Sequence, residues 1–462
     1  MAGMQTENAQ ELNDFSKGSI ARNILSLALP MTLAQLINVM YSIVDRIYIG
    51  HIPDASTYPL TGIGLCLPII TIITAFANLF GMGGAPLCSI ARGGHEEDRA
   101  QKVMGNSFSM LLISGAVLMI LCLIFKEPLL FIFGASEATY PYADQYITIY
   151  LCGTLFVMTS LGMNNFINAQ GFGKTGMLTV LLGAVLNIIL DPILIFGFGM
   201  GVQGAAVATV ISQGASAVWV LKFLCGRKAL LKLTRKSMLL QAGLVKEITL
   251  LGTSGFVMSV TNGTVQIVCN AVLARHGGDL YVGIMTVINS VREIITMPVT
   301  GLTSGAQPVI GYNYGAGCYD RVKSAIKFIS VGCVVFSFVM WAVLFFEPQF
   351  FLQLFTKESE LIREGIPAMR IYFCGIFMMA LQFAGQSTYV ALSRPKQAVF
   401  FSLFRKVIIV VPLTLLLPMI AGLGTNGVFL AEPVSNVIGG TASFVTMLIT
   451  VWPTLKKTDK MS

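Results

Sequence analysis

Charge is scarce in this 462-residue sequence: only 11% of the residues are Asp, Glu, Lys or Arg, while 55% are hydrophobic. A soluble domain carries about twice that share of charged residues. The mean hydropathy is +0.76, and apolar runs long enough to cross a bilayer, at roughly 20 residues each, recur along the chain. These features exclude a soluble enzyme with a single anchor and predict an all-α polytopic membrane protein.

Motifs for catalysis and nucleotide use are also missing. The sequence has no GxxxxGK[ST] motif for ATP, no HExxH, only three histidines, and nine scattered cysteines without a CxxC pair. We therefore expect no enzyme, no cofactor, no resident metal and no ATP, so that transport must draw on an ion gradient or a partner protein. The residues through Ser16 lack the pattern of a cleaved signal peptide. The net charge of +8 indicates membrane topology, not nucleic-acid binding.

Twelve membrane spans are expected, with both ends of the chain on one side. The spans cover 24–49, 60–88, 103–125, 146–169, 177–198, 203–224, 248–274, 281–311, 325–346, 370–392, 398–420 and 427–452. We divide the chain into an N-terminal segment (1–23), an N-lobe with the first six spans (24–224), a basic linker (225–247), a C-lobe with the last six (248–452) and a tail (453–462).

Loop charges predict the orientation, because cytoplasmic loops of membrane proteins are enriched in Lys and Arg. Basic residues concentrate on the face that carries both termini and the segment from Lys222 to Lys246, whereas the opposite loops hold few. Both termini and the linker are therefore expected in the cytoplasm, in a multi-pass protein of the plasma membrane.

An internal repeat relates the two halves. Tyr150-Leu151-Cys152-Gly153 recurs 222 residues later as Tyr372-Phe373-Cys374-Gly375, and Pro86, Asp98-Arg99 and Lys174 have counterparts at the same offset. His51 meets His276 after a small adjustment. Six spans per half make the two lobes parallel, and transporters with such repeats bind their substrates at the repeat interface.

The central stretch of the sequence is Leu186 to Phe196, an apolar segment that contains Asp191. An acid in mid-span costs roughly 2.5–3.5 kcal/mol on insertion scales, so it persists where it faces a protein-lined interior or binds a proton or cation. Asn187 lies one turn earlier on the same helical face, and Pro192 bends the helix by removing a backbone donor. Asp191 is interpreted as a cation or proton site; a cap for backbone groups freed by the kink is the alternative.

Other polar residues within spans are candidates for the transport pathway or for helix–helix hydrogen bonds. Asp45, near the end of the first span, is either a partner of Asp191 or half of an ion pair with Arg46. Arg292-Glu293 is either a neutralised pair or part of a cavity, and Glu432 is a further intramembrane acid. The remaining candidates for a substrate cavity are amides, one phenol and one thioether: Gln35, Asn38, Tyr41, Asn164, Gln213, Gln266, Asn270, Asn289, Met297 and Gln307.

Several motifs together resemble those of the multidrug and toxic compound extrusion (MATE) family, in its MepA-like and DinF-like branches. The motifs are Pro30, Val44-Asp45, Gly171-Phe-Gly-Lys174, Leu186-Asn-x-x-Leu-Asp-Pro192, Gly204-Ala-Ala-x-Ala-Thr209 and the run from Pro298 to Ala316. The resemblance implies two six-helix lobes around a V-shaped cavity that alternates between inward- and outward-open states. It also implies that Asp45, Asn187, Asp191 and Thr209 carry the coupling cation. Residues 262–270 lack the C-lobe acid of the NorM-like branch.

The function expected from these features is secondary active multidrug export, and hence antibiotic resistance. Organic, often cationic or amphiphilic, compounds would be exchanged for H⁺ or Na⁺ by a monomer that binds no nucleic acid. A flippase for lipid-linked oligosaccharide or another lipid-linked precursor is the main alternative; it would need cavity cations, whereas the interior charges noted here lean acidic. A channel or scaffold is a third interpretation.

Overall fold

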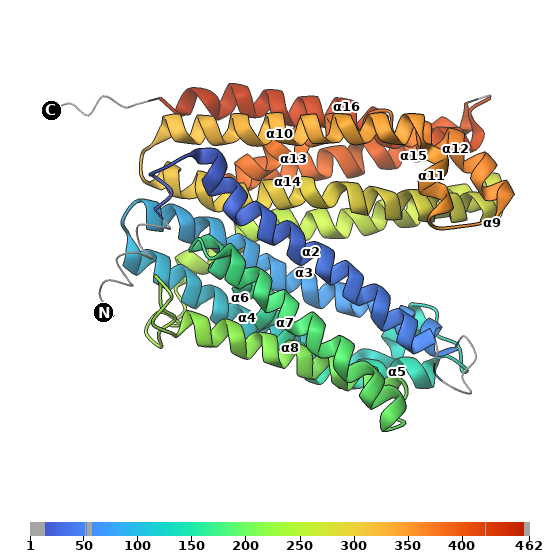
Figure 1. Ribbon diagram of the computed structural model, residues 1–462, viewed down its shortest axis with the longest axis horizontal. Coiled ribbons are helices and arrows are strands. Elements are labelled where there is room, and N and C mark those ends of the chain that lie inside the picture. The colour runs from blue at the N-terminus through green and yellow to red at the C-terminus, as the bar shows by residue number, and fades with distance from the viewer. Residues whose placement is uncertain (1–13, 51, 53–57, 421, 457–462) are drawn as a thin grey trace. The chain divides into compact units, whose positions relative to one another are not determined.

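The computed structural model describes residues 14–50, 52, 58–420 and 422–456 (Figure 1). Most of the expected N-terminal segment, His51 of the repeat, and residues 457–462 of the tail lie outside these described residues. Within them the chain is helical and contains no strand. It divides into two compact units, one built from residues 29–252 and the other from residues 15–28 and 253–456. We call these units the N-lobe and the C-lobe.

The N-lobe contains the first set of spans. Its elements are α2 (Ile20–Gly50), of which the part from Leu29 belongs here, α3 (Tyr58–Gly93), α4 (Glu97–Ile132), α5 (Tyr140–Cys152), α6 (Thr154–Ala169), α7 (Gly173–Pro192), the π-helix η1 (Ile193–Gly197) and α8 (Val202–Leu224). Helices α3, α4 and α6 pack against one another, and α8 packs on α5, α6 and α7. Many large apolar side chains of these helices are exposed, among them Ile124 and Val218, as expected of helices that face lipid.

The C-lobe repeats this plan. It comprises most of α9 (Ala242–Gly315), α10 (Tyr319–Phe346), α11 (Pro348–Gln353), α12 (Ser359–Phe373), α13 (Ile376–Ala391), α14 (Pro395–Leu403), the π-helix η2 (Phe404–Val410), α15 (Val411–Leu416), the 3₁₀-helix η3 (Leu417–Met419), α16 (Gly424–Thr450) and η4 (Trp452–Thr454). In Figure 1, α13 lies beside α10 and α16.

Twelve spans are accounted for in the described part of the chain. Nine helices are long and apolar enough to cross a membrane, and two further spans are pairs of helices joined at a bend. The long helix α9 holds two spans, because its helical geometry breaks at Gly278 with φ 70° and ψ −167°. Positive φ is accessible to glycine at little cost, so Gly278 permits the turn between the spans. The all-helical fold with twelve spans in two lobes agrees with the prediction from sequence.

The repeated Tyr-x-Cys-Gly motif marks the same bend in each lobe. The fourth span consists of α5 and α6, which meet at Gly153 with a bend of 57°, and the tenth consists of α12 and α13, bent by 43° after Phe373. A Cβ at Gly153 would lie 2.6 Å from a methyl carbon of Val210, and one at Gly375 would lie 3.0 Å from the Pro433 carbonyl oxygen. The glycines therefore allow a neighbouring helix to approach the bend.

The fifth and eleventh spans both contain a π-helical segment. Segment η1 follows Pro192 directly, and η2 precedes Pro412 in α15. A proline removes a backbone donor from the helical ladder, and a π segment is one way in which a helix absorbs such a fault. The bend expected at Pro192 is thus accompanied by a local change of helix type, and the C-lobe carries its own version of it.

Small residues bring helices close together within the N-lobe. The Gly81-Met-Gly-Gly segment of α3 approaches three different partners: a Cβ at Gly81 would lie 2.7 Å from the Gly162 carbonyl oxygen, one at Gly83 would collide with the Ile248 carbonyl, and one at Gly84 would meet Phe166. Small residues at such crossings are typical of membrane helix packing.

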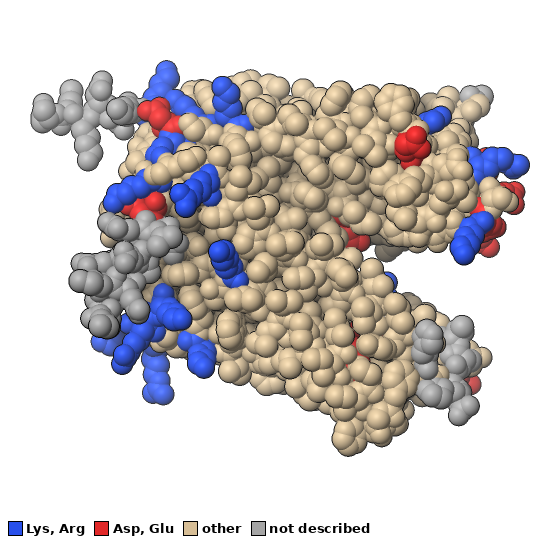
Figure 2. Space-filling model, viewed as in Figure 1, with Lys and Arg blue, Asp and Glu red and all other residues tan. Residues whose placement is uncertain are grey.

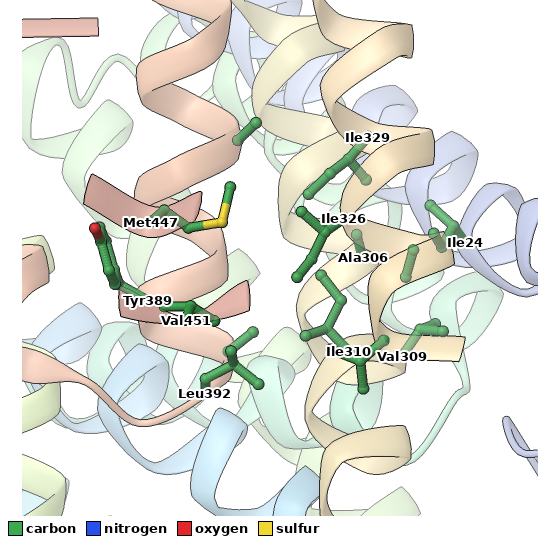
Figure 3. Packing of buried hydrophobic residues seen from close by; sticks show 14 of the residues in the cluster. Ile24, Ala306, Val309, Ile310, Ile326, Ile329, Tyr389, Leu392, Met447 and Val451 are labelled. Carbon is green, nitrogen blue, oxygen red and sulfur yellow. The ribbon is translucent and has the colours of Figure 1, made fainter. Parts of the chain in front are cut away.

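The start of α2 packs in the C-lobe, not in the N-lobe. Ile24 belongs to an apolar cluster with residues of α9, α10, α13 and α16, which Figure 3 shows from close by. The guanidinium of Arg321 donates to the backbone carbonyls of Phe15 (2.8 Å) and Lys17 (3.0 Å), and the Asn313 amide donates to Phe15 as well (3.0 Å). Residues 15–28 are therefore held on the C-lobe by both packing and hydrogen bonds.

The basic linker is folded onto the N-lobe. The Asn106 side chain donates to the carbonyls of Ser237 (3.2 Å) and Leu239 (3.1 Å), and its oxygen accepts from the backbone nitrogen of Gln241 at 2.7 Å. Lys and Arg side chains of each lobe gather mainly at one end of its bundle (Figure 2). This is the end where α4 begins and α8 finishes in the N-lobe, and where α10 and α14 begin in the C-lobe.

Candidate functional site

A buried polar cluster occupies the interior of the N-lobe, where α2, α5, α7 and α8 meet. Asp191 is fully buried, and the carboxyl groups of Asp45 and Asp191 lie within hydrogen-bond reach of each other. Neither Asp45 Oδ1 nor Asp191 Oδ1 accepts a hydrogen bond from the described residues. No ion pair between Asp45 and Arg46 is present among those residues, so the structure places Asp45 beside Asp191 and favours the first of its two interpretations.

The Asn187 amide connects the acids to α8. In the orientation that satisfies both its atoms, its nitrogen donates to Asp191 Oδ2 at 2.8 Å and its oxygen accepts from the Thr209 backbone nitrogen at 3.3 Å. The Thr209 hydroxyl in turn donates to the Ala205 carbonyl at 3.0 Å. Because Asn187 and Asp191 are separated by one turn of α7, their spacing in sequence places both groups on the same helical face, as predicted.

Two tyrosines complete the cluster. Tyr41 on α2 lines the same cavity as Thr209, and Tyr146 on α5 is buried. Tyr146 stacks on Tyr150, with ring centroids 6.1 Å apart.

A cavity of about 170 Å³ opens next to this cluster within the N-lobe. Asn187 and Thr209 of the cluster line it, and so do five residues predicted for the substrate cavity: Gln35, Asn38, Tyr41, Asn164 and Gln213. Ser160 donates to the Gln213 side-chain oxygen at 2.7 Å, and Asn164 donates to the Gly176 carbonyl at 3.2 Å. The cavity therefore presents amides, hydroxyls and a phenol, but its lining contains no formal charge.

Two neighbouring carboxyls inside an apolar lobe have a definite chemical capacity. Two like charges at this separation repel strongly in a medium of low dielectric constant, so the pair is stabilised by a shared proton or by a bound cation. Carboxylate, amide and hydroxyl oxygens are also the ligands that hard cations prefer. The cluster is suited to binding H⁺ or Na⁺, and the lack of a donor to either Oδ1 among the residues that the structure describes fits that capacity.

The C-lobe contains a larger cavity of about 440 Å³. Three residues predicted for the substrate cavity line it, namely Gln266, Asn289 and Glu293. Arg292, Arg405 and Lys406 line it too, and all three approach a single oxygen, Oε1 of Glu432, at 3.7, 3.0 and 3.2 Å. Arg292 thus pairs with Glu432 and not with its neighbour Glu293, and both residues line the cavity, so the structure favours the interpretation of Arg292-Glu293 as part of a cavity over that of a neutralised pair.

Three predicted cavity residues lie elsewhere in the C-lobe. Asn270, Met297 and Gln307 are not in the lining of either cavity. Met297 is buried, and Asn270 has a buried side-chain oxygen without a partner among the described residues. Asn270 lies one turn beyond Gln266, and Gln307 lies seven residues beyond Thr300, which is the last residue of α9 in the lining, so these two residues are displaced along the helix and not around it.

Comparison with known proteins gives the family. The MatE family model matches residues 30–193 and 256–416, which together make up most of the chain. The chain belongs to the MatE family. It is 27% identical over 416 residues to the multidrug export protein MepA of Staphylococcus haemolyticus, covering 90% of each chain, and 26% identical over 403 residues to MepA of Staphylococcus aureus, covering 87% of this chain and 88% of that one. A solved MATE structure in the bent conformation superposes with a TM-score of 0.91 over 98% of this chain and 99% of its own, at 21% identity.

The chain is thus a MATE family transporter similar to MepA. The sequence predicted some residues of the N-lobe cluster and missed others. Asp191, Asn187, Asp45 and Thr209 come together as expected. Tyr146 was missed, although it opens the span expected at 146–169 and its position four residues before Tyr150 is a visible signal.

Arg405 and Lys406 were also missed. They lie within an expected span (398–420). Ionisable residues within spans are rare and usually functional, so two adjacent cations there indicate a site that the sequence analysis did not include. The expectation from sequence was that the interior charges are mainly acidic. This holds for the N-lobe site with Asp45 and Asp191, but the buried charges around the C-lobe cavity are mainly basic.

Proposed function

We propose that this protein is a secondary active multidrug exporter that exchanges organic compounds, many of them cationic or amphiphilic, for H⁺ or Na⁺. The single observation that supports this most is the Asp45–Asp191 pair: two neighbouring acids inside the N-lobe, beside a cavity that presents amides and hydroxyls. The relatives described as multidrug export proteins support the substrate class.

The acid pair provides the exchange. With a carboxylate ionised, the N-lobe attracts a cationic substrate; when H⁺ or Na⁺ neutralises the pair, that attraction ends and the substrate leaves. Neutralisation of Asp191 directly weakens its hydrogen bond with Asn187, because the Asn187 amide donates to Asp191 Oδ2. Coupling requires each ligand to bind the two conformational states with different affinities, and the helix-type change after Pro192 is the element we assign to that difference.

The membrane potential adds to the driving force. A potential of 100 mV contributes about 2.3 kcal/mol per charge moved, enough for roughly fifty-fold accumulation per net charge. No ATP or other cofactor is part of this cycle. The transport unit is the monomer, since each proposed site is formed within one lobe of one chain.

We place the protein in the plasma membrane with both termini in the cytoplasm, on the basis of the Lys and Arg at one end of each lobe. A reporter fused after the last residue tests this orientation. Green fluorescent protein there should fluoresce, and alkaline phosphatase there should be inactive; the reverse pattern would place the tail outside.

A flippase for lipid-linked precursors is the second candidate, and a specific observation favours it. Such a substrate carries a diphosphate, and the C-lobe cavity presents Arg292, Arg405 and Lys406. Arg and Lys are the side chains that bind phosphate groups. The N-lobe acid pair has no role in holding a diphosphate, which is why we rank export first.

Cellular accumulation of a cationic dye separates the two candidates. Expression of the wild-type protein should lower accumulation of a lipophilic cationic dye, and the Asp191→Asn variant, expressed to the same level, should not. The matched control is Asp98→Asn, which removes an exposed carboxylate that pairs with Lys102 at the start of α4. Unchanged dye accumulation with wild-type protein would contradict export and favour the flippase.

A further inference from the structure

Three basic side chains converge on one carboxylate oxygen in the C-lobe. Lys406 Nζ lies 3.2 Å from Glu432 Oε1, Arg405 Nη1 lies 3.0 Å from it, and Arg292 Nη1 lies 3.7 Å from it. The side chains of Arg405 and Lys406 are only 8% and 4% exposed. One buried acid cannot neutralise three cations. A second acid, Glu293, also lines the cavity, but it is exposed, so the group as a whole stays positive.

The cluster is built into the middle of the lobe. Arg405 and Lys406 lie in η2, within a span that runs from Pro395 to Met419. Space for Arg405 comes from Gly439 on α16, where a Cβ would lie 2.8 Å from Arg405 Cγ. A π-helical segment that carries two cations against a glycine is a specific arrangement, and π segments recur at functional sites.

The internal repeat shows what these cations replace. At the repeat offset of 222 residues, Arg405 and Lys406 correspond to Gly183 and Ala184, which line the N-lobe cavity. Ser160 and Asn164 of that cavity correspond to Gln382 and Gln386, which line the C-lobe cavity. The two cavities therefore occupy equivalent places in the two lobes, but the C-lobe cavity has gained two positive charges.

One hydrogen-bond donor of the cationic cluster in the C-lobe cavity has no partner among the described residues. Arg405 uses Nη1 for Glu432 and for the Asn436 side-chain oxygen, while its Nε is buried and has no partner among the described residues. A guanidinium presents its donors as a rigid fork that matches a carboxylate or a phosphate. Beside it, the cavity offers the amides of Gln266, Asn289 and Gln386 and the hydroxyls of Ser290 and Thr296.

We propose that the C-lobe cavity binds an anionic group, a carboxylate or a phosphate, of the transported compound, held by Arg405, Lys406 and Arg292. Preferred substrates then carry a negative group together with an apolar or cationic body. This proposal rests on the proposed export function, and it adds a second recognition site of opposite charge to the acid pair of the N-lobe.

A matched pair of dyes tests it. Tetramethylrhodamine carries a free carboxylate, and its methyl ester lacks only that charge. Binding of each dye to the purified full-length protein in lipid nanodiscs would be measured by fluorescence polarisation. We expect wild-type protein to bind the acid about tenfold or more tighter than the ester, as hydrogen bonds to a charged group imply. Lys406→Gln and Arg405→Gln should each reduce this preference to about twofold.

Controls distinguish recognition from a structural role. Each variant leaves Glu432 with two of its three cations, and melting temperature and affinity for the ester report whether the lobe is intact. Lys327→Gln, the same change at an exposed position of α10, should leave the preference as in wild type. Sodium acetate and inorganic pyrophosphate would then be added as competitors: displacement mainly by acetate assigns a carboxylate, and displacement mainly by pyrophosphate assigns a phosphate.

The outcomes separate this proposal from the export function. Equal binding of both dyes by the wild-type protein, or an undiminished preference in both variants, overturns the anion site, even if ion-driven transport of the ester is intact. Preference for the acid that disappears in the variants supports the site, even if neither dye is transported, in which case it is the export function that fails.

Discussion

At the scale of single residues, the two lobes solve the problem of buried charge in opposite ways. The N-lobe places two acids together, so that the pair requires a proton or a cation. The C-lobe surrounds one acid with three bases. An ionisable side chain in mid-membrane costs roughly 2.5–3.5 kcal/mol on insertion scales, and neither cluster is internally neutral. Each is therefore better suited to a ligand than to a purely structural role.

The C-lobe cluster makes a prediction about stability. Glu432→Gln leaves three cations without their shared partner, and breaking a buried pair in this way costs about 3–5 kcal/mol. Lys406→Met removes one desolvated cation, while Glu432 keeps Arg405 and Arg292, so its effect on the free energy of unfolding should stay within about 1 kcal/mol. Denaturant unfolding of both variants in detergent measures the difference. A larger loss for Lys406→Met than for Glu432→Gln would contradict the arrangement.

Residue-level prediction from sequence worked where spacing alone decides proximity. Asn187 and Asp191 share a helical face because they are four residues apart, and the structure confirms this. Asp45 and Tyr146 reach the same cluster from other helices, and only packing brings them there. Arg405 and Lys406 could have been predicted from the sequence, because they are two charged residues in an otherwise apolar span.

At the scale of helices, both lobes contain interruptions of regular α-helix in spans that line their cavities. Gly153 and Gly375 place a bend in the fourth and tenth spans, and π segments occupy the fifth and eleventh. The sequence repeat predicted that the positions of the two bends correspond, because Tyr150–Gly153 and Tyr372–Gly375 are recognisably the same motif. It did not predict the bends, since no local signal distinguishes a bent glycine helix from a straight one.

Pro192→Ala tests the role of the interruption next to the acids. The alanine restores a backbone donor, which favours a continuous α-helix in place of α7 followed by η1. We expect export of a cationic dye to fall several-fold, while the melting temperature stays the same or rises. Pro128→Ala, near the end of α4, is the matched control and should transport normally. Full transport by Pro192→Ala would remove this bend from the mechanism.

Close helix contacts in the N-lobe give a separate prediction. A side chain at Gly83 would collide with the Ile248 backbone carbonyl, which cannot move without its helix. Gly83→Ala should therefore lower the free energy of unfolding by about 1–3 kcal/mol, the usual cost of overpacking. Gly263→Ala on α9, where a Cβ meets nothing within 4 Å, should be neutral. Thermal unfolding in detergent compares the two, and equal stability would show that α3 and α9 can separate.

At the scale of the whole molecule, composition and repeat were sufficient to predict the architecture. Low charge and recurrent apolar runs predicted spans, and the structure confirms twelve of them in two lobes. The assignment of the first residues differs: residues 15–28 pack with the C-lobe, whereas the sequence division placed 1–23 in a terminal segment and began the N-lobe at 24. Nothing local to those residues shows this, because their contacts are with Asn313 and Arg321, about 300 positions away.

Ion coupling through Asp191 is the central step of the proposed transport cycle. Purified protein in proteoliposomes should be tested for cationic-dye transport with pH and Na⁺ gradients imposed separately, in wild type, Asp191→Asn and the exposed control Asp98→Asn. We predict that one of the two gradients drives transport by wild type and by Asp98→Asn, and that Asp191→Asn, folded and with an unchanged melting profile, shows none. Gradient-driven transport by Asp191→Asn at the wild-type rate would contradict the central claim.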